Sequence, residues 1–144
     1  MTNKVALGFD IGDRRIGVAR GDFEVRIASP LPSIMNDRAT FTQIADLIKK
    51  NSAAIIVIGL PRNSDGAETR QSVISRNFAD ELVKFTDAKI VFQDESLTSV
   101  SAENNLRAHR DFDEKMLRDG TLDSEAAALI LQDFLNSGNT KGLE

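Results

Sequence analysis

The fold of this chain is decided by residues 5–20, VALGFDIGDRRIGVAR. Large apolar residues at every second position alternate with small residues, and Asp10 stands at the end of the series, which is the two-residue period of a β-strand. Gly12-Asp13 then predicts a turn, and residues 15–20 predict a second strand. The stretch therefore predicts a β-hairpin that carries a carboxylate where its first strand ends.

The rest of the chain continues this pattern with both strands and helices. After the hairpin we expect strands at 24–28, 55–58 and 90–93 and helices at 41–50, 74–85, 100–108 and 124–135. Pro30 and Pro32 are expected to end the third strand, and the polar segment 109–120 is expected to form a mobile arm. This order predicts an α/β fold: a five-stranded mixed sheet, with an antiparallel meander of three strands plus two parallel strands, flanked by helices.

Composition narrows the chemistry that the chain can perform. Its 144 residues are the usual size of one domain, and they contain no cysteine and one histidine, His109. Disulfides, thiol chemistry and Cys/His zinc sites are therefore excluded, and any metal must bind to oxygen ligands. No apolar run is long enough to cross a bilayer, and no signal sequence is recognisable, so we expect a cytoplasmic protein without membrane contact.

The charge is distributed unevenly along the chain. The net charge is -4 and the pI is about 5.1, which argues weakly against nonspecific nucleic-acid binding. Residues 1–76 hold 11 Lys/Arg and 8 Asp/Glu, a balance of +3, whereas residues 77–144 hold 7 and 14, a balance of -7. The first half is a candidate surface for a polyanion, although solvated surface charge explains the same counts.

Acidic residues occur where several predicted elements begin or end. Asp10 and Glu95 follow predicted strands, and Asp123 opens the last predicted helix. Functional groups in such sheets gather at the carboxyl ends of parallel strands, and carboxylates are the ligands that Mg²⁺ prefers. Taken singly, however, Asp10 is also a turn former, Glu95 an ordinary loop residue and Asp123 a helix-capping residue.

Four blocks of the sequence together resemble a known family. They are LGFDIGDRRIGVA at 7–19, IVIGLP at 56–61, DESLT at 94–98 and LDSEAAALIL at 122–131. In this order and with these separations they resemble the YqgF family of Holliday junction resolvase-like proteins, over nearly the whole chain. The resemblance implies that residues 1–138 form one RNase H-like nuclease domain and that 139–144 are a disordered tail.

The same resemblance implies a chemistry. It places the catalytic and metal-binding acids at Asp10, Glu95 and Asp123, with Mg²⁺ as cofactor and Mn²⁺ as a substitute. Water would attack the phosphodiester in line and leave a 5′-phosphate and a 3′-hydroxyl. The implied substrates are branched DNA or the 5′ end of precursor 16S ribosomal RNA, and the sequence does not choose between them.

Other residues are candidates for contact with nucleic acid. They are Arg14, Arg15, Arg62, Arg70 and Thr98. Family members commonly carry arginine where this chain has Ser96, so a bidentate phosphate contact is missing here and substrate preference is affected. The metal-binding acids are unaffected by this departure.

Two other functions and the oligomeric state stay open at this point. The glycines around Asp10 also resemble the phosphate-binding hairpin of sugar-kinase and actin-like ATPases, but those enzymes need two lobes. A noncatalytic module that binds RNA or the ribosome is the other alternative. The chain is expected to be a monomer or a weak homodimer, since a two-fold junction would favour a dimer.

Overall fold

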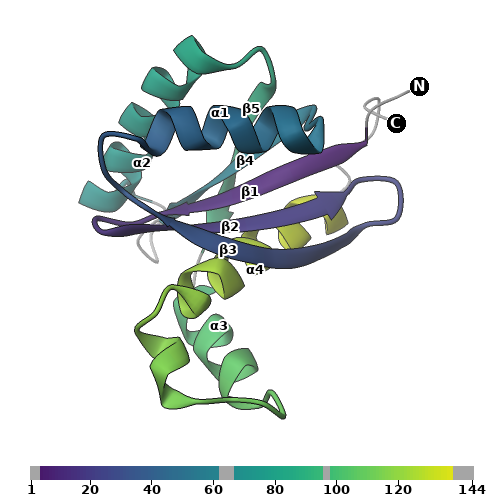
Figure 1. The fold of residues 1–144 in the computed structure, drawn as a ribbon, viewed down its shortest axis with the longest axis vertical. Coiled ribbons are helices and arrows are strands. Elements are labelled where there is room, and N and C mark those ends of the chain that lie inside the picture. The colour runs from purple at the N-terminus through teal and green to yellow at the C-terminus, as the bar shows by residue number, and fades with distance from the viewer. Residues whose placement is uncertain (1–3, 62–66, 96–97, 138–144) are drawn as a thin grey trace.

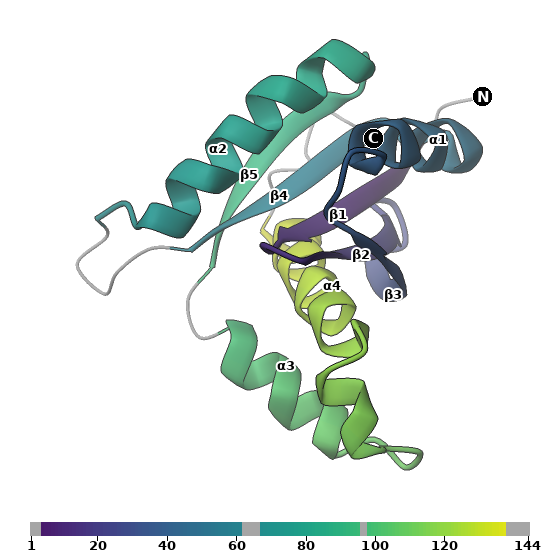
Figure 2. The ribbon, with the colours of Figure 1, turned by 60° about the vertical axis from the view of Figure 1, so that its left-hand side comes forward.

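The computed structural model describes residues 4–61, 67–95 and 98–137, which form one twisted sheet with helices on both faces (Figures 1 and 2). The strands are β1 (Val5–Ile11), β2 (Arg15–Asp22), β3 (Ile27–Met35), β4 (Ile55–Pro61) and β5 (Lys89–Glu95). They lie in the order β3-β2-β1-β4-β5; β1, β2 and β3 pair antiparallel, and β4 pairs parallel with both β1 and β5. The predicted α/β fold with a mixed five-stranded sheet is confirmed.

The helices are distributed over the two faces of the sheet. They are α1 (Thr40–Asn51), α2 (Arg70–Leu82), α3 (Thr98–Arg107) and α4 (Thr121–Asn136), with short 3₁₀ helices at Val83–Phe85 and Glu114–Leu117. Helices α1 and α2 cover one face, and α4 covers the other (Figure 2). Helix α3 and the 3₁₀ turn at Glu114–Leu117 project away from the sheet (Figure 1). No helix in the described part of the chain is long and apolar enough to span a bilayer.

Alternating side chains divide the interior into two cores. Leu7 and Phe9 of β1 point toward α1 and α2, whereas Ala6 packs with α4. Strand β4 contributes to both cores because all its residues except Pro61 are buried, as expected for a central strand without polar alternation. Small residues dominate only the α4 face of β1 and β2. Helix α4 can therefore lie close to the strands on this face.

The third strand differs from the prediction. It was expected at 24–28 and to end before the prolines, but β3 runs from Ile27 to Met35 through both Pro30 and Pro32. It occupies one edge of the sheet, where the strand has only β2 as a partner, so a missing N–H is tolerated. The two prolines therefore lie within the edge strand β3 and do not end it.

Helices α2 and α4 begin four and three residues earlier than predicted. Helix α2 begins at Arg70 because Thr69 and Ser72 form a reciprocal capping box, with Ser72 N donating to Thr69 Oγ1 at 3.0 Å and Thr69 N donating to Ser72 Oγ at 2.9 Å. Helix α4 begins at Thr121 after Gly120, whose φ of 100° suits glycine. Asp123 thus lies within the first turn of α4 and does not open it.

Candidate active site

Glycines on one face of the sheet let α4 approach the strands closely. They are Gly8 in β1, Gly17 and Gly21 in β2, and Gly59 in β4. A Cβ on Gly8 would lie 2.8 Å from Cβ of Leu131, and a Cβ on Gly17 would lie 1.9 Å from the carbonyl oxygen of Asp123. No side chain fits in so short a gap, so the position of α4 on the sheet depends on these glycines.

Asp10 lies beside the first turn of α4. It is the penultimate residue of β1 and pairs across the sheet with Gly17 of β2. Because the backbone of Asp123 rests on Gly17, the register places Asp10 and Asp123 next to each other on the α4 face. Asp10 and Asp123, which are more than a hundred residues apart in the sequence, are therefore neighbours in the fold.

Glu95 reaches the same face from the other side. It is the last residue of β5 and pairs with Pro61 of β4. Its side chain turns back over the sheet, because a Cβ on Gly59 would lie 2.3 Å from Glu95 Oε2. Strand β4 runs alongside β1, with Ile58 opposite Phe9, so Gly59 follows at the level of Asp10. Gly59, which lies in the IVIGLP motif, leaves the space that Glu95 occupies.

The pKa values of the three acids show how closely they interact. Burial, together with the charge of Asp123, raises the pKa of Asp10 to about 6. Burial, together with the charge of Asp10, raises the pKa of Glu95 to about 8. Burial raises the pKa of Asp123 as well, while Arg15 opposes the increase. The site thus concentrates negative charge in a poorly solvated place.

The acids form two neighbouring pairs that share Asp10, and not a closed ring. In residues 4–61, 67–95 and 98–137, no three acidic, histidine or cysteine side chains are already gathered around one point as a metal site. Yet Glu95 Oε2 is buried without a hydrogen-bond partner in the described part of the chain. An orphaned carboxylate oxygen and mutual repulsion are both relieved by a bound cation, and an all-oxygen donor set suits Mg²⁺. The residues therefore fit a divalent ion.

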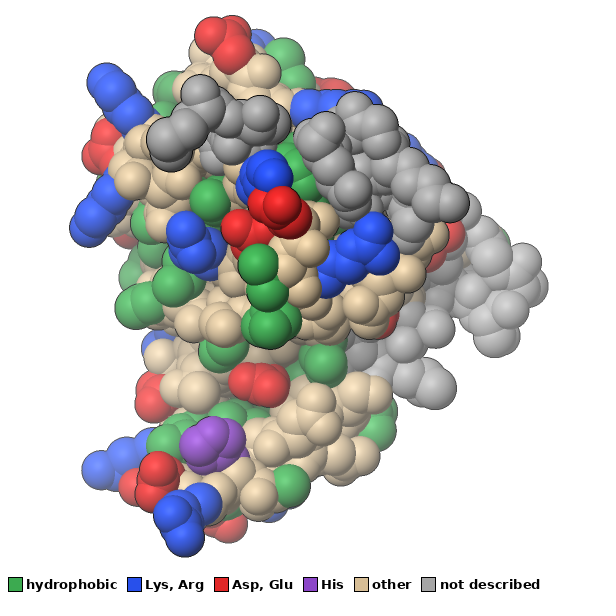
Figure 3. Space-filling model, turned by 90° about the vertical axis from the view of Figure 1, so that its right-hand side faces the viewer, with side chains coloured by type: hydrophobic (Ala, Val, Ile, Leu, Met, Phe, Trp, Pro, Cys, Tyr) green, Lys and Arg blue, Asp and Glu red, His purple; other side chains and the backbone are tan. Residues whose placement is uncertain are grey.

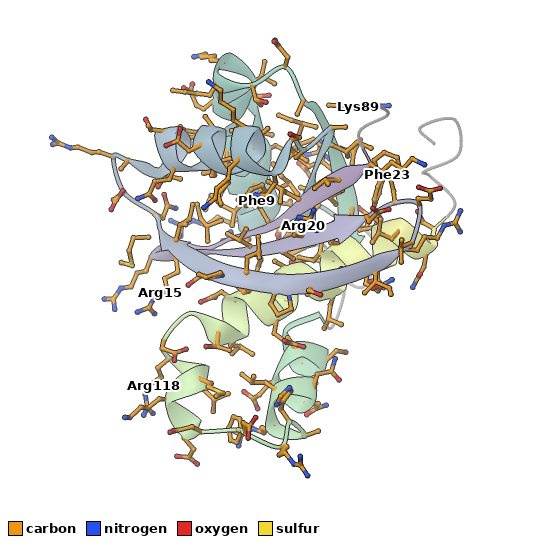
Figure 4. All side chains as sticks on the ribbon, turned by 45° about the vertical axis from the view of Figure 1, so that its right-hand side comes forward. Phe9, Arg15, Arg20, Phe23, Lys89 and Arg118 are labelled. Carbon is orange, nitrogen blue, oxygen red and sulfur yellow. The ribbon has the colours of Figure 1, made fainter. Side chains whose placement is uncertain are left out.

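The arginines near the first hairpin have different surroundings. Arg14 is exposed, whereas Arg15 is partly buried and donates from Nη1 to the carbonyl oxygen of Arg118 at 2.7 Å. Figure 4 shows Arg15 at the lower edge of the sheet, facing the projecting segment that carries Arg118. Arg70 is exposed in the first turn of α2, which Gln71 ties to the hairpin by donating to the Ile11 carbonyl oxygen at 2.6 Å. Arg14 and Arg70 are thus exposed near the hairpin turn, whereas Arg15 links β2 to the segment before α4.

Two of the candidate contacts with nucleic acid are not fully described. Arg62 lies outside the described residues, as does Ser96, where the family commonly carries arginine. Thr98 is the first residue of α3, but its side chain also falls outside the described part. The suggested contacts of Arg62 and Thr98 with nucleic acid stay predictions.

The surface shows no segregation of charge on the face in Figure 3, where basic and acidic side chains are interspersed. His109 is exposed on the projecting segment. The sequence-level excess of positive charge in the first half of the chain therefore does not produce a uniform basic face there.

Gly17 and Ser124, which lie where β2 meets the first turn of α4, were not among the candidates from the sequence. A signal for Gly17 was present, because Gly17, Ala19 and Gly21 are small at every second position of β2, which is typical of a strand face under a close helix. Ser124 gives no such signal. A serine in the first turn of a helix is ordinary, and its partner is set by the tertiary fold.

Comparison with solved structures defines the class of fold. The chain is similar to Thermus thermophilus RuvC in complex with a Holliday junction, with a TM-score of 0.54, 11% identity and coverage of 92% of this chain and 94% of the other. It is also similar to the fowlpox virus Holliday junction resolvase, with a TM-score of 0.56, 11% identity and coverage of 92% and 99%. The fold is therefore RNase H-like, of the type found in RuvC resolvases.

Sequence comparison then gives the family. Residues 4–137 match the family model described as "RuvX: Holliday junction resolvase". A Chloroflexus aggregans protein named "Putative pre-16S rRNA nuclease" is 38% identical over 140 residues, covering 95% of this chain and 96% of its own. An Anaeromyxobacter protein of the same name is 39% identical over 133 residues, covering 90% and 95%. The chain belongs to the RuvX family of nucleases, and the YqgF resemblance drawn from the motifs is confirmed.

Proposed function

We propose that this chain is a cytoplasmic, divalent-metal-dependent endonuclease that hydrolyses phosphodiester bonds near the 5′ end of precursor 16S ribosomal RNA. One observation carries the chemistry: Asp10 lies between Asp123 and Glu95, and all three carboxyls have raised pKa values in a partly buried place. Such an arrangement is costly for the metal-free protein, which indicates a functional role. Relatives that cover nearly the whole chain favour RNA as substrate, because their names specify it.

Asp10, Glu95 and Asp123 would hold the Mg²⁺ ion or ions, with Asp10 as the shared carboxylate. When bound, Mg²⁺ supplies charge stabilisation at the phosphate and a more acidic water. Glu95, whose pKa is raised to about 8, must lose its proton before it can bind a cation near neutral pH. Asp10, at about 6, is mostly ionised under the same conditions.

The remaining residues of the site would position the substrate. Arg14 is exposed in the hairpin turn, Arg70 is exposed at the start of α2 beside it, and both can contact phosphates next to the cleaved bond. In the hydrolysis, a water oxygen bonds to phosphorus and the bond to the 3′ oxygen breaks. The products are a 5′-phosphate and a 3′-hydroxyl, the latter taking up a proton.

A side-by-side cleavage assay tests substrate and activity together. Wild-type protein is incubated with Mg²⁺ or Mn²⁺ and a 5′-extended ribosomal RNA precursor, a four-way DNA junction or plain duplex. We expect cleavage of the precursor with 5′-phosphate ends and none of plain duplex. If the protein cleaves only the four-way junction, its substrate is branched DNA and not RNA, as the family description suggests.

Substitution of single acids separates an enzyme from a binding module. Asp10→Asn, Glu95→Gln and Asp123→Asn are each expected to abolish cleavage while nucleic-acid affinity stays near that of wild type. If wild type binds the precursor but cuts no substrate with either metal, the noncatalytic alternative is correct. The RuvX family match favours the nuclease over the ATP-binding alternative, which thermal stabilisation by ATP would revive.

A further inference from the structure

Three residues at the start of β2, Arg15, Gly17 and Val18, contact the first turn of α4 or the segment just before it. Arg15 donates to the carbonyl oxygen of Arg118, just before α4, at 2.7 Å. Gly17 lies against the backbone of Asp123 and Ser124. The N–H of Val18 donates to Ser124 Oγ at 3.1 Å, and these two residues are 106 positions apart. The strand therefore determines where this turn can lie.

The hydrogen bond to Ser124 lies at an irregularity in the sheet. Ile16 pairs with Ile34 and Val18 with Leu31, so two residues of β3 oppose Gly17 alone and the register shifts between β2 and β3. Ser124 Oγ reaches the strand at this place. Ser124 is only 2% exposed and Val18 is fully buried, so water cannot take over the role of acceptor.

The neighbouring residue in α4 is Asp123. A hydrogen bond from the strand to Ser124 fixes both the height and the rotation of this turn above β2. It thereby fixes the direction of Asp123, whose backbone lies against Gly17, the β1 partner of which is Asp10. Close packing over Gly17 prevents the turn from moving inward, and the bond to Ser124 prevents it from moving outward.

We propose that Ser124 is a positioning residue of this nuclease: by accepting the Val18 N–H, it holds Asp123 beside Asp10 in the geometry that binds the divalent ion. The inference rests on the proposed function, because it needs Asp123 to be a ligand. Residues that orient metal ligands typically change metal affinity about 10- to 100-fold when they are mutated.

The test compares Ser124→Ala with a matched control, Thr40→Val. Thr40 is also fully buried, and its hydroxyl accepts a backbone N–H, from Asp37 at 2.8 Å, but it lies in α1 on the opposite face of the sheet. Binding of Mn²⁺ alone is measured by calorimetry well below the melting temperature of each protein, and kcat and KM are measured on the cleaved substrate. Ser124→Cys, which keeps the size and a weak acceptor, serves as the second variant.

We expect Ser124→Ala to bind Mn²⁺ about tenfold more weakly and to lose kcat with little change in KM, with Ser124→Cys intermediate. Thr40→Val is expected to lose stability and keep wild-type Mn²⁺ affinity. If Ser124→Ala melts lower but binds Mn²⁺ as wild type does, Ser124 is only structural and the inference is overturned. If Ser124→Ala does not fold, a Ser124→Cys variant that melts lower than wild type but binds Mn²⁺ as wild type does overturns the inference equally. If wild type itself binds no Mn²⁺, the proposed function fails first.

Discussion

The carbonyl oxygen of Asp123 lies so close to Gly17 that a Cβ at residue 17 would be 1.9 Å away. This contact joins the start of β2 to the first turn of α4 and sets the distance between them. Since Asp10 is the β1 partner of Gly17, the same contact determines how near Asp123 comes to Asp10. The glycine is thus required by the candidate site although it carries no chemistry.

Gly17→Ala is expected to lift the first turn of α4 off the sheet. Overpacking of this kind costs about 1–3 kcal/mol of unfolding free energy, and Mn²⁺ affinity should also fall because Asp123 moves. Chemical denaturation and Mn²⁺ calorimetry measure the two effects. Gly21→Ala is the control: its Cβ would meet a Leu135 methyl at 3.0 Å and the Ile27 carbonyl oxygen and a Leu131 methyl at 3.1 Å, at the other end of β2 from the acids. Equal Mn²⁺ affinity in both variants would contradict the prediction.

The raised pKa values predict how stability depends on pH when divalent cations are removed. In the folded chain the pKa is about 6 for Asp10 and about 8 for Glu95, whereas both are near 4 when unfolded. The folded state therefore binds more protons than the unfolded state in this interval. The free energy of unfolding should fall as pH rises from about 4 to about 8 and then level off.

Glu95→Gln removes most of this pH dependence. In EDTA the variant should match wild type near pH 4 and exceed its unfolding free energy at pH 8.5 by on the order of 3 kcal/mol. Urea denaturation at the two pH values measures the difference. Glu81→Gln, on the exposed side of α2, is the control and should follow wild type. Parallel pH profiles for Glu95→Gln and wild type would show that Glu95 is not buried as described.

Substitutions of the adjacent residues Arg14 and Arg15 are expected to change stability by different amounts. Arg15 donates to the carbonyl oxygen of Arg118, so Arg15→Ala should lose about 1.5–3 kcal/mol of stability, the range for a hydrogen bond from a charged group. Arg14→Ala, at an exposed position, should change stability by less than about 0.5 kcal/mol. Denaturation curves that rank the two variants in the opposite order would contradict this assignment.

Arg14 and Arg70 are expected to contribute to affinity for nucleic acid without selecting a sequence. In an Asp10→Asn background, Arg14→Ala and Arg70→Ala should each weaken binding to precursor RNA and reduce the salt dependence of log K by about 0.7–0.9. Fluorescence titrations from low to moderate salt measure both quantities. Arg20→Ala is the control, since Arg20 donates to Asn51 Oδ1 at 3.2 Å at the other end of β2. An unchanged salt slope in all three variants would remove these arginines from the interface.

The sequence by itself determined the elements and the family. Alternation in residues 5–20 predicted the hairpin, the apolar run at 55–58 predicted a central strand, and four ordered motifs identified the acids to be considered. These inferences succeeded because hydrophobic period and motif order are local properties of the chain. Local signals failed at Pro30 and Pro32, where only the position of β3 at the sheet edge makes the prolines acceptable.

Only the tertiary structure decided how the acids are arranged. The register of β1 and β2, the glycines beneath α4 and the bond from Val18 to Ser124 bring Asp123 beside Asp10, and the space over Gly59 admits Glu95. Each of these contacts joins residues far apart in sequence, so no local pattern encodes it. The raised pKa values have the same origin, because burial and the charge of a neighbouring acid exist only once the chain is folded.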